Sequence, residues 1–257
     1  LCSLMTHMVA GYPDGQIDID VARGLIDGGS SFLEVQFPFS DPSADGVPIQ
    51  DACERALESG FKVDRGFDLI RRIHDLSDKP VFIMSYGSIV YARGIEKFVS
   101  QAREAGAVGL IIPDLMPGYD EGLFEAAAAM DLHVVPVIPP GIEEPRLSEI
   151  LALNSAYLYA SLRVGITGTR TELDESVFSF LEQLKSTGKW VCAGFGIQTN
   201  EQVRQLRDYA DTLIVGSAIV KTISEAVSQE QSIYAAVRRK VEDLLGSGNS
   251  IETKTAE

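Results

Sequence analysis

Short apolar runs alternate with longer stretches of helical period along almost the whole chain, and this alternation limits the possible folds more than any other feature. The runs are rich in β-branched residues, follow glycine or polar turns, and have the length of strands. Eight are predicted as strands: Met5–Ala10, Phe32–Phe37, Val81–Tyr86, Val108–Ile112, His133–Ile138, Ala156–Ser161, Trp190–Ala193 and Thr212–Val215. Helices are predicted between them, among them Ile17–Ile26, Ile95–Glu104, Glu121–Met130 and Asn200–Leu206.

Helical segments between strands predict parallel crossover connections. Eight such βα units predict an α/β protein that forms a single (β/α)8 barrel of the TIM type. An open, doubly wound sheet would show the same continuous apolar strands, but the count of eight and the glycine-rich turns after the last strands favour a closed barrel. We expect residues 1–245 to form this domain and residues 246–257 to form a polar, disordered tail.

Charge and composition exclude several classes of function. The chain has 37 acidic and 22 basic residues and a formal charge of −15, which disfavours nucleic acid as a partner. No apolar run approaches the roughly 18 residues of a membrane span, and Leu1–Gly11 lacks the basic start of a signal peptide. Cys2, Cys53 and Cys192 fit neither a disulfide framework nor a zinc cluster. We therefore expect a cytoplasmic protein with reduced thiols and no membrane association.

Carboxylates gather at the end of the second predicted strand, and the carboxyl ends of barrel strands are where such folds carry function. Glu34 lies inside the apolar run FLEVQF, and Asp41 and Asp45 follow in PFSDPSADG. Burial among apolar neighbours favours the protonated form of a carboxyl group, which is the state that a general acid needs. A structural carboxylate paired with an arginine is an equally good interpretation of Glu34 from the sequence alone.

Four further polar residues lie on or at the ends of predicted strands. Asp114 ends the fourth strand, and strand-end aspartates often cap the following helix. Tyr86 and Tyr159 belong to the third and sixth strands, where tyrosines usually fill a core with the hydroxyl group bonded. His7 lies inside the first strand and is predicted to line the barrel rather than to act as a base. The residue types alone favour structural roles for all four.

Three glycine-rich turns follow the last three predicted strands, in the segments RVGITG, AGFG and VGSA. Glycine lets backbone amides approach an anion closely, and a helix that begins near Ser217 would direct its amino end at the same place. A phosphate site on consecutive strands is therefore predicted, against the alternative of tight turns without a ligand.

The residues that a Schiff-base aldolase or a metal-dependent aldolase needs are not found at the expected places in the sequence. A Schiff-base enzyme needs a lysine at a barrel mouth, but Lys79 and Lys189 precede strands and Lys221 lies beyond the last phosphate turn. Among the three histidines, His133 starts a strand and His74 lies in a helical stretch, which leaves no metal-binding triad. The pattern predicts acid–base catalysis by carboxylates on a phosphorylated substrate, with no metal and no cofactor.

Several of these segments also resemble one family when they are taken together. LEVQFPFSDPSADGVPIQ, IIPD, RVGITG, GFGI and VGSAIVK occur in this order, and they are similar to motifs of the tryptophan synthase α subunit family over nearly the whole chain. The resemblance implies a (β/α)8 barrel that cleaves indole-3-glycerol phosphate into indole and glyceraldehyde 3-phosphate by a retro-aldol reaction. It also implies a tryptophan synthase β subunit as partner, which receives the indole in an α2β2 complex.

The same resemblance implies roles for individual residues. Glu34 matches the catalytic glutamate that exchanges protons between the substrate hydroxyl and indole C3, and Asp45 matches the aspartate that accepts a hydrogen bond from the indole N–H. Tyr159 matches an active-site tyrosine near the glutamate. The substrate-binding positions are His7, Tyr86 and Thr167, and the phosphate-binding positions are Gly168, Phe195, Gly196, Gly216 and Ser217.

Four residues depart from the family pattern. Gln36 replaces a common glycine beside the catalytic strand, and His7 replaces an aromatic residue that packs on the indole. Ser88 and Met116 alter segments that the family uses near the β subunit. A stand-alone indole-releasing lyase and a non-catalytic subunit that activates β are therefore alternatives. Another phosphosugar barrel, such as an isomerase, would fit the glycines but would leave the ADG loop unexplained.

Overall fold

A computed structural model describes residues 2–153, 155–162, 173–194 and 196–246. Within these ranges the strands form one parallel sheet, in the order β5-β4-β3-β2-β1-β9-β8-β7-β6. The strands are β1 (Ser3–Val9), β2 (Phe32–Gln36), β3 (Val81–Met84), β4 (Gly109–Ile111), β5 (His133–Val134), β6 (Val137–Ile138), β7 (Tyr157–Ser161), β8 (Trp190–Gly194) and β9 (Thr212–Val215). Each predicted strand is therefore present, with ends that differ by a few residues.

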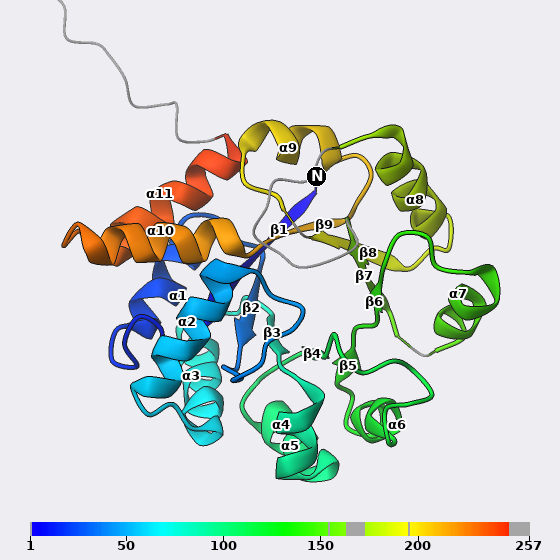
Figure 1. Ribbon diagram of the computed structural model, residues 1–257, viewed down its shortest axis with the longest axis horizontal. Coiled ribbons are helices and arrows are strands. Elements are labelled where there is room, and N and C mark those ends of the chain that lie inside the picture. Colours follow the sequence, from blue (N-terminus) through cyan, green and yellow to red (C-terminus); the bar gives the residue numbers. More distant parts are fainter. Residues whose placement is uncertain (1, 154, 163–172, 195, 247–257) are drawn as a thin grey trace, which may run out of the picture.

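Helices surround this sheet on its outside (Figure 1). They are α1 (Asp18–Asp27), α2 (Val47–Glu58), α3 (Val63–Leu76), α4 (Gly87–Arg93), α5 (Ile95–Glu104), α6 (Leu123–Ala128), α7 (Glu144–Leu151), α8 (Glu175–Lys185), α9 (Asn200–Leu206), α10 (Ser217–Ser228) and α11 (Ile233–Leu245). Helix α6 is shorter than the predicted Glu121–Met130 because Glu121 and Gly122 have positive φ angles, of 50° and 87°, which are incompatible with a right-handed helix. No helix in the described part of the chain is both long enough and apolar enough to cross a membrane.

The sheet closes at the fifth predicted strand, which is divided into β5 and β6. The Val135 amide donates to the Leu110 carbonyl at 2.8 Å, on the side of β4. The next residue, Pro136, accepts from the Tyr159 amide at 2.9 Å, on the side of β7. Consecutive residues of one extended segment thus bond to the two ends of the strand order. The prediction of a single barrel is confirmed, and the prediction of one unbroken strand over His133–Ile138 is corrected.

Alternate residues of each strand face the barrel axis, as the period of two requires. On β2, Leu33 and Val35 belong to the outer core between sheet and helices. Glu34 and Gln36 consequently face inwards, where the inner core of Met5, Phe82, Met84, Tyr86, Ile111, Val135, Tyr159, Cys192 and Ile214 is almost entirely apolar. Both inward polar side chains are buried, so each of them needs a specific hydrogen-bond partner.

Aromatic side chains fill the amino end of the barrel. Phe32, Phe82, Tyr157 and Trp190 contact one another with ring centroids 5.4 to 6.4 Å apart. The Trp190 indole N–H also donates to the Thr212 hydroxyl at 2.8 Å. This layer blocks the amino end, so a ligand reaches the barrel interior from the carboxyl ends of the strands.

The first and last units of the barrel meet where α1 packs against α11. Glycine permits this close approach: a Cβ atom on Gly28 would lie 2.7 Å from the Val241 Cβ and 2.8 Å from the Arg238 carbonyl oxygen. The φ of Gly28 is −73°, a value that any residue adopts. The glycine at this position is therefore required for helix packing and not for its backbone conformation.

We predict that Gly28→Ala lowers the free energy of unfolding by about 1–3 kcal/mol, because the added methyl group forces α11 away from α1. Urea denaturation followed by circular dichroism measures this change. Gly15→Ala is the matched control, since its Cβ would meet no atom closer than 4.0 Å, and it should change stability by less than about 0.5 kcal/mol. Equal stability of the two variants would contradict this account of the α1–α11 contact.

Candidate active site

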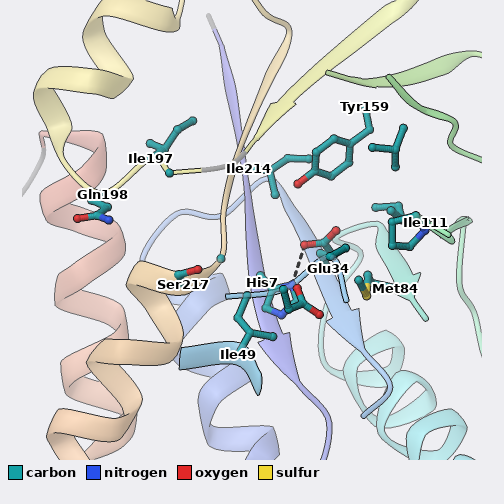
Figure 2. A pocket seen from close by; sticks show the side chains of 16 residues that line it. His7, Glu34, Ile49, Met84, Ile111, Tyr159, Ile197, Gln198, Ile214 and Ser217 are labelled. Atoms are coloured by element: carbon teal, nitrogen blue, oxygen red, sulfur yellow. Dashed lines mark hydrogen bonds and ion pairs between the residues drawn. The ribbon is translucent and has the colours of Figure 1, made fainter. Parts of the chain in front are cut away.

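One pocket opens at the carboxyl ends of the strands and penetrates the barrel (Figure 2). About 620 Å³ of space lies between its walls, part of it open to solvent. Its lining residues are His7, Glu34, Ala44, Asp45, Ile49, Met84, Ile111, Pro113, Val137, Tyr159, Gly196, Ile197, Gln198, Ile214, Gly216 and Ser217. The pocket therefore gathers residues from all eight predicted strands or the turns after them.

Most of the predicted site residues belong to the lining of this pocket. The structure brings together Glu34, Asp45, Tyr159, His7, Gly196, Gly216 and Ser217. Tyr86 is not among the lining residues and lies behind Asp45, to which it is bonded. Thr167, Gly168 and Phe195 lie outside the described residues, as does the tail 247–257.

Glu34 and His7 form a direct pair across two neighbouring strands. The register of β1 and β2 places these two residues opposite each other, and His7 Nδ1 lies 2.7 Å from Glu34 Oε2 (Figure 2). Both side chains are almost completely buried. The partner of the buried glutamate is thus a histidine, and not the arginine that the structural interpretation of Glu34 assumed.

The electrostatics of this pair favour a charged imidazole. Burial acts to lower the pKa of His7, but the hydrogen bond and negative charge of Glu34 outweigh it, with a further contribution from Asp45. The pKa of His7 therefore lies above its ordinary value of 6.5.

Asp45 is held by a different set of donors. The Gln36 amide nitrogen and the Tyr86 hydroxyl both donate to Asp45 Oδ2, at 2.7 and 2.8 Å. Burial raises the pKa of Asp45, while the charge of His7 and these two hydrogen bonds oppose the rise. Both bonds reach Oδ2, so among the described residues the second oxygen, Oδ1, stays available to accept a hydrogen bond from a ligand.

Two buried tyrosines lie near the carboxylates. Tyr86 is stacked on Phe39, with centroids 5.2 Å apart, and its hydroxyl accepts a bond from the Ala44 amide while it donates to Asp45. The Tyr159 ring is buried against β8, where any Cβ on Gly194 would overlap its hydroxyl. Burial raises the pKa of both tyrosines well above the ordinary value, so both remain neutral.

Asp114 has a structural role in the described fold. Its carboxylate accepts from the Gly87 amide at 2.9 and 3.1 Å, at the first residue of α4. The predicted cap of the following helix is therefore corrected: Asp114 binds the amino end of a helix that precedes it in the chain. This contact is possible because β3, which precedes α4, and β4, which precedes Asp114, are adjacent in the sheet.

The opposite wall of the pocket presents backbone amides and a hydroxyl group. Gly216 is the N-cap of α10, a helix of 12 residues that begins at Ser217, and the first amides of a helix have no acceptor within it. Gly196 has a φ of 82°, which favours glycine. The buried Gln202 side chain fixes the turn over residues 196–198. It accepts a hydrogen bond from the Gln198 amide at 2.9 Å and donates one to the Gly196 carbonyl at 3.2 Å. This wall can bind an anion without a cationic side chain.

Apolar residues make up much of the pocket lining beside the acidic groups and the anion-binding turns. Figure 2 shows Ser217 and Gln198 to the left of His7 and Glu34, with aliphatic side chains around these four residues. The apolar lining residues are Ile49, Met84, Ile111, Pro113, Val137, Ile197 and Ile214. The arrangement fits a ligand with a flat apolar part near the carboxylates and a phosphate at the other end. Across the described ranges, no group of three or more histidine, cysteine, aspartate or glutamate residues could hold a metal ion.

Sequence reasoning did not identify the contacts of Gln36 and His7 with the two carboxylates. A signal was present, because Gln36 is two residues from Glu34 and must share its face of the strand. The pairing of His7 with Glu34 required the register between β1 and β2. The aliphatic lining residues carried no recognisable motif.

Comparison with known proteins agrees with this geometry. The family model described as tryptophan synthase alpha chain matches residues 2–246. A tryptophan synthase alpha chain of Helicobacter hepaticus is 37% identical over 235 residues, which are 89% of this chain and 88% of the relative. That of Methanothermobacter thermautotrophicus is 33% identical over 251 residues, which are 97% of this chain and 93% of the relative.

Solved structures show the same relationship. The tryptophan synthase alpha subunit of Legionella pneumophila has a TM-score of 0.87 and 28% identity, covering 97% of this chain and 94% of that one. A chain from the α2β2 tryptophan synthase complex of Pyrococcus furiosus, studied for its mutual activation, has a TM-score of 0.85 and 30% identity, covering 95% and 98%. On the family match, the identities and the shared fold, this chain belongs to the tryptophan synthase alpha chain family.

Proposed function

We propose that this chain cleaves indole-3-glycerol phosphate to indole and glyceraldehyde 3-phosphate, as a carbon–carbon lyase of tryptophan biosynthesis. The observation that carries the proposal is a single pocket with two buried carboxylates on one wall and the glycine-rich start of α10 on the other. The apolar residues of the pocket lining suit the apolar indole ring. Family membership supplies the substrate, and the pocket supplies a place for each part of it.

In the proposed reaction, Glu34 moves protons and Asp45 stabilises charge. Glu34 as a carboxylic acid gives its proton to indole C3, which breaks the aromaticity of the ring and places positive charge at the ring nitrogen. Asp45 accepts a hydrogen bond from that N–H through its free Oδ1 and stabilises the charge. Glu34, now a carboxylate, takes the proton of the side-chain hydroxyl as the carbon–carbon bond breaks, so a carbonyl forms and the electrons of the bond restore the indole.

Other residues take supporting roles in this proposal. The start of α10, with Gly216 and Ser217, binds the phosphate together with Gly196. Tyr159 borders the reacting carbon beside Glu34, and its burial keeps it neutral. Thr167, Gly168 and Phe195 are assigned to the same site from the family resemblance. Residues 1–245 act as one catalytic domain.

A tryptophan synthase β subunit is the proposed partner, in an α2β2 assembly that receives the indole. Two apolar side chains in the loop after β4 support a docking region near the pocket mouth: Met116 is 53% exposed and Tyr119 is 78% exposed. Pro113 of the same loop lines the pocket. A partner bound there would contact a loop that is continuous with the site.

The proposed location is the cytoplasm. Cys2, Cys53 and Cys192 are all free thiols. Burial raises the pKa of Cys53 and of Cys192 to about 12. These two thiols therefore stay protonated and unreactive, and cysteines without disulfide bonds are typical of cytosolic proteins.

We predict that Glu34→Gln lowers the rate of indole release by about 100- to 10,000-fold, because the amide cannot donate and recover a proton in the required sequence. Indole formation from indole-3-glycerol phosphate measures the rate. Asp41→Asn is the matched control, since Asp41 belongs to the same loop but is exposed, and it should retain wild-type activity. Full activity of the glutamine variant would contradict the assignment of Glu34.

We also predict that a β subunit raises the indole release of the wild-type chain, because a partner that orders the mouth loops favours the reactive state. The rate is measured with and without added β subunit. Turnover that is rapid alone and unchanged by β would establish the stand-alone lyase. The non-catalytic subunit would be established by two results together. The chain would release no indole with or without β, and wild type and Glu34→Gln would activate the β reaction equally.

A third prediction concerns the phosphate wall. Ser217→Asp should raise the KM for indole-3-glycerol phosphate at least about tenfold, because its negative charge lies where the phosphate binds. The same charge at a helix amino end stabilises the helix, so the free energy of unfolding should not fall. Ser217→Asn is the matched control, because asparagine has nearly the same shape as aspartate but no charge, and it should change KM much less. Equal KM values for the two variants would place the phosphate elsewhere.

A further inference from the structure

Two buried polar atoms beside the catalytic carboxylates have no hydrogen-bond partner among the residues that the structure describes. They are His7 Nε2 and Gln36 Oε1. One is the second ring nitrogen of the histidine that binds Glu34, and the other is the carbonyl oxygen of the side chain that donates to Asp45. Burying a polar atom without a hydrogen-bond partner is unfavourable, so the occurrence of two such atoms at one place calls for an explanation.

The two atoms are chemically complementary. An imidazole that is protonated on both nitrogens donates from Nε2, and an amide oxygen accepts. The residues are diagonal neighbours, since His7 pairs in register with Glu34 and Gln36 follows Glu34 by two residues on the same face of β2. The Gln36 side chain also acts on His7 in the direction that stabilises its protonated form.

We propose that His7 and Gln36 form a hydrogen-bonded relay that joins the two catalytic carboxylates, in the order Glu34–His7–Gln36–Asp45. His7 Nδ1 donates to Glu34, His7 Nε2 donates to the Gln36 carbonyl, and the Gln36 amide donates to Asp45. The inner link requires His7 Nε2 and Gln36 Oε1 to turn toward each other, and the two outer links are present at 2.7 Å each. His7 and Gln36 are positioning residues in this scheme, because they act on the substrate through the carboxylates.

The relay explains how two carboxylates can be buried side by side. A doubly protonated His7 supplies a positive charge between two negative ones, and all of its hydrogen atoms on nitrogen are then bonded. The charged groups that act on the ring are Glu34 and Asp45. Tyr159 and Cys192 on β7 and β8 remain neutral because burial raises the pKa of each, and Gly216 and Ile49, on the α10 and α2 side, carry no titratable group.

For the proposed reaction, the relay makes His7 a proton store for Glu34. The pair carries one proton, as a carboxylate with an imidazolium or as a carboxylic acid with a neutral imidazole. It loses this proton to indole C3 and regains one from the substrate hydroxyl, so the proton count is restored after each turnover. The reaction then stops as rising pH removes the proton from the pair.

The direct test is the titration of His7 by nuclear magnetic resonance of the imidazole nitrogens. Its signals are distinguished from those of His74 and His133 by comparison with His7→Phe. We expect wild-type His7 to titrate above 6.5, and in Glu34→Gln to titrate below 6.5, because burial is then opposed only by the smaller contributions of Asp45 and Gln36. In Gln36→Met, which keeps the length of the side chain without its amide, we expect a smaller downward change.

The kinetic test is the pH dependence of kcat/KM for indole release, and this part rests on the proposed function. The alkaline limb should lie above pH 6.5 in wild type and move down by about one pH unit in His7→Phe, with a smaller move in Gln36→Met. Met84→Leu is the control, because it changes the pocket lining without touching the relay, and its limb should not move.

The two tests separate the relay from the lyase activity. A wild-type His7 that titrates at or below 6.5 would overturn the relay, and so would a Gln36→Met variant that leaves both the titration and the alkaline limb unchanged. A chain that releases no indole but shows the expected titrations would refute the proposed function and leave the relay established.

Discussion

The burial of two carboxylates beside each other in an otherwise apolar barrel is the constraint on which the site depends. A buried charge costs several kcal/mol unless it is paired and hydrogen-bonded. Glu34 is hydrogen-bonded to His7, and Asp45 is hydrogen-bonded to Gln36 and Tyr86, which offsets the cost of burial. All these partners come from three neighbouring strands or their ends, so the register of β1, β2 and β3 determines the chemistry of the pocket.

The remaining architecture serves this arrangement. Closure through β5 and β6 makes the strand ends converge on one mouth, and the aromatic layer at Phe32 and Trp190 blocks the opposite end. The start of α10 and the carboxylates line the same pocket, together with aliphatic side chains. In the proposed binding mode, the indole ring of the substrate lies beside the carboxylates and its phosphate lies at the start of α10.

Much of this could be predicted from the sequence, because strand periodicity and glycine-rich turns are local signals. The strand positions, the barrel, and the placement of Glu34, Gly216 and Ser217 at the carboxyl ends of the strands all depended on such signals. The division of the fifth strand was not predicted. It arises because Pro136 has no N–H to donate and the chain changes its hydrogen-bond partner strand between Val135 and Pro136. The His7–Glu34 and Gln36–Asp45 contacts also required the register between strands and the fold of the loop before α2, which no local pattern specifies.

The most direct test of the account is a crystal structure of the Glu34→Gln variant with intact indole-3-glycerol phosphate. We expect the phosphate oxygens within hydrogen-bond distance of the Gly216 and Ser217 amides, the indole N–H directed at Asp45, and C3 next to the side chain at position 34. A ligand bound in the opposite direction, with its phosphate beside Asp45, or bound outside this pocket, would contradict the account.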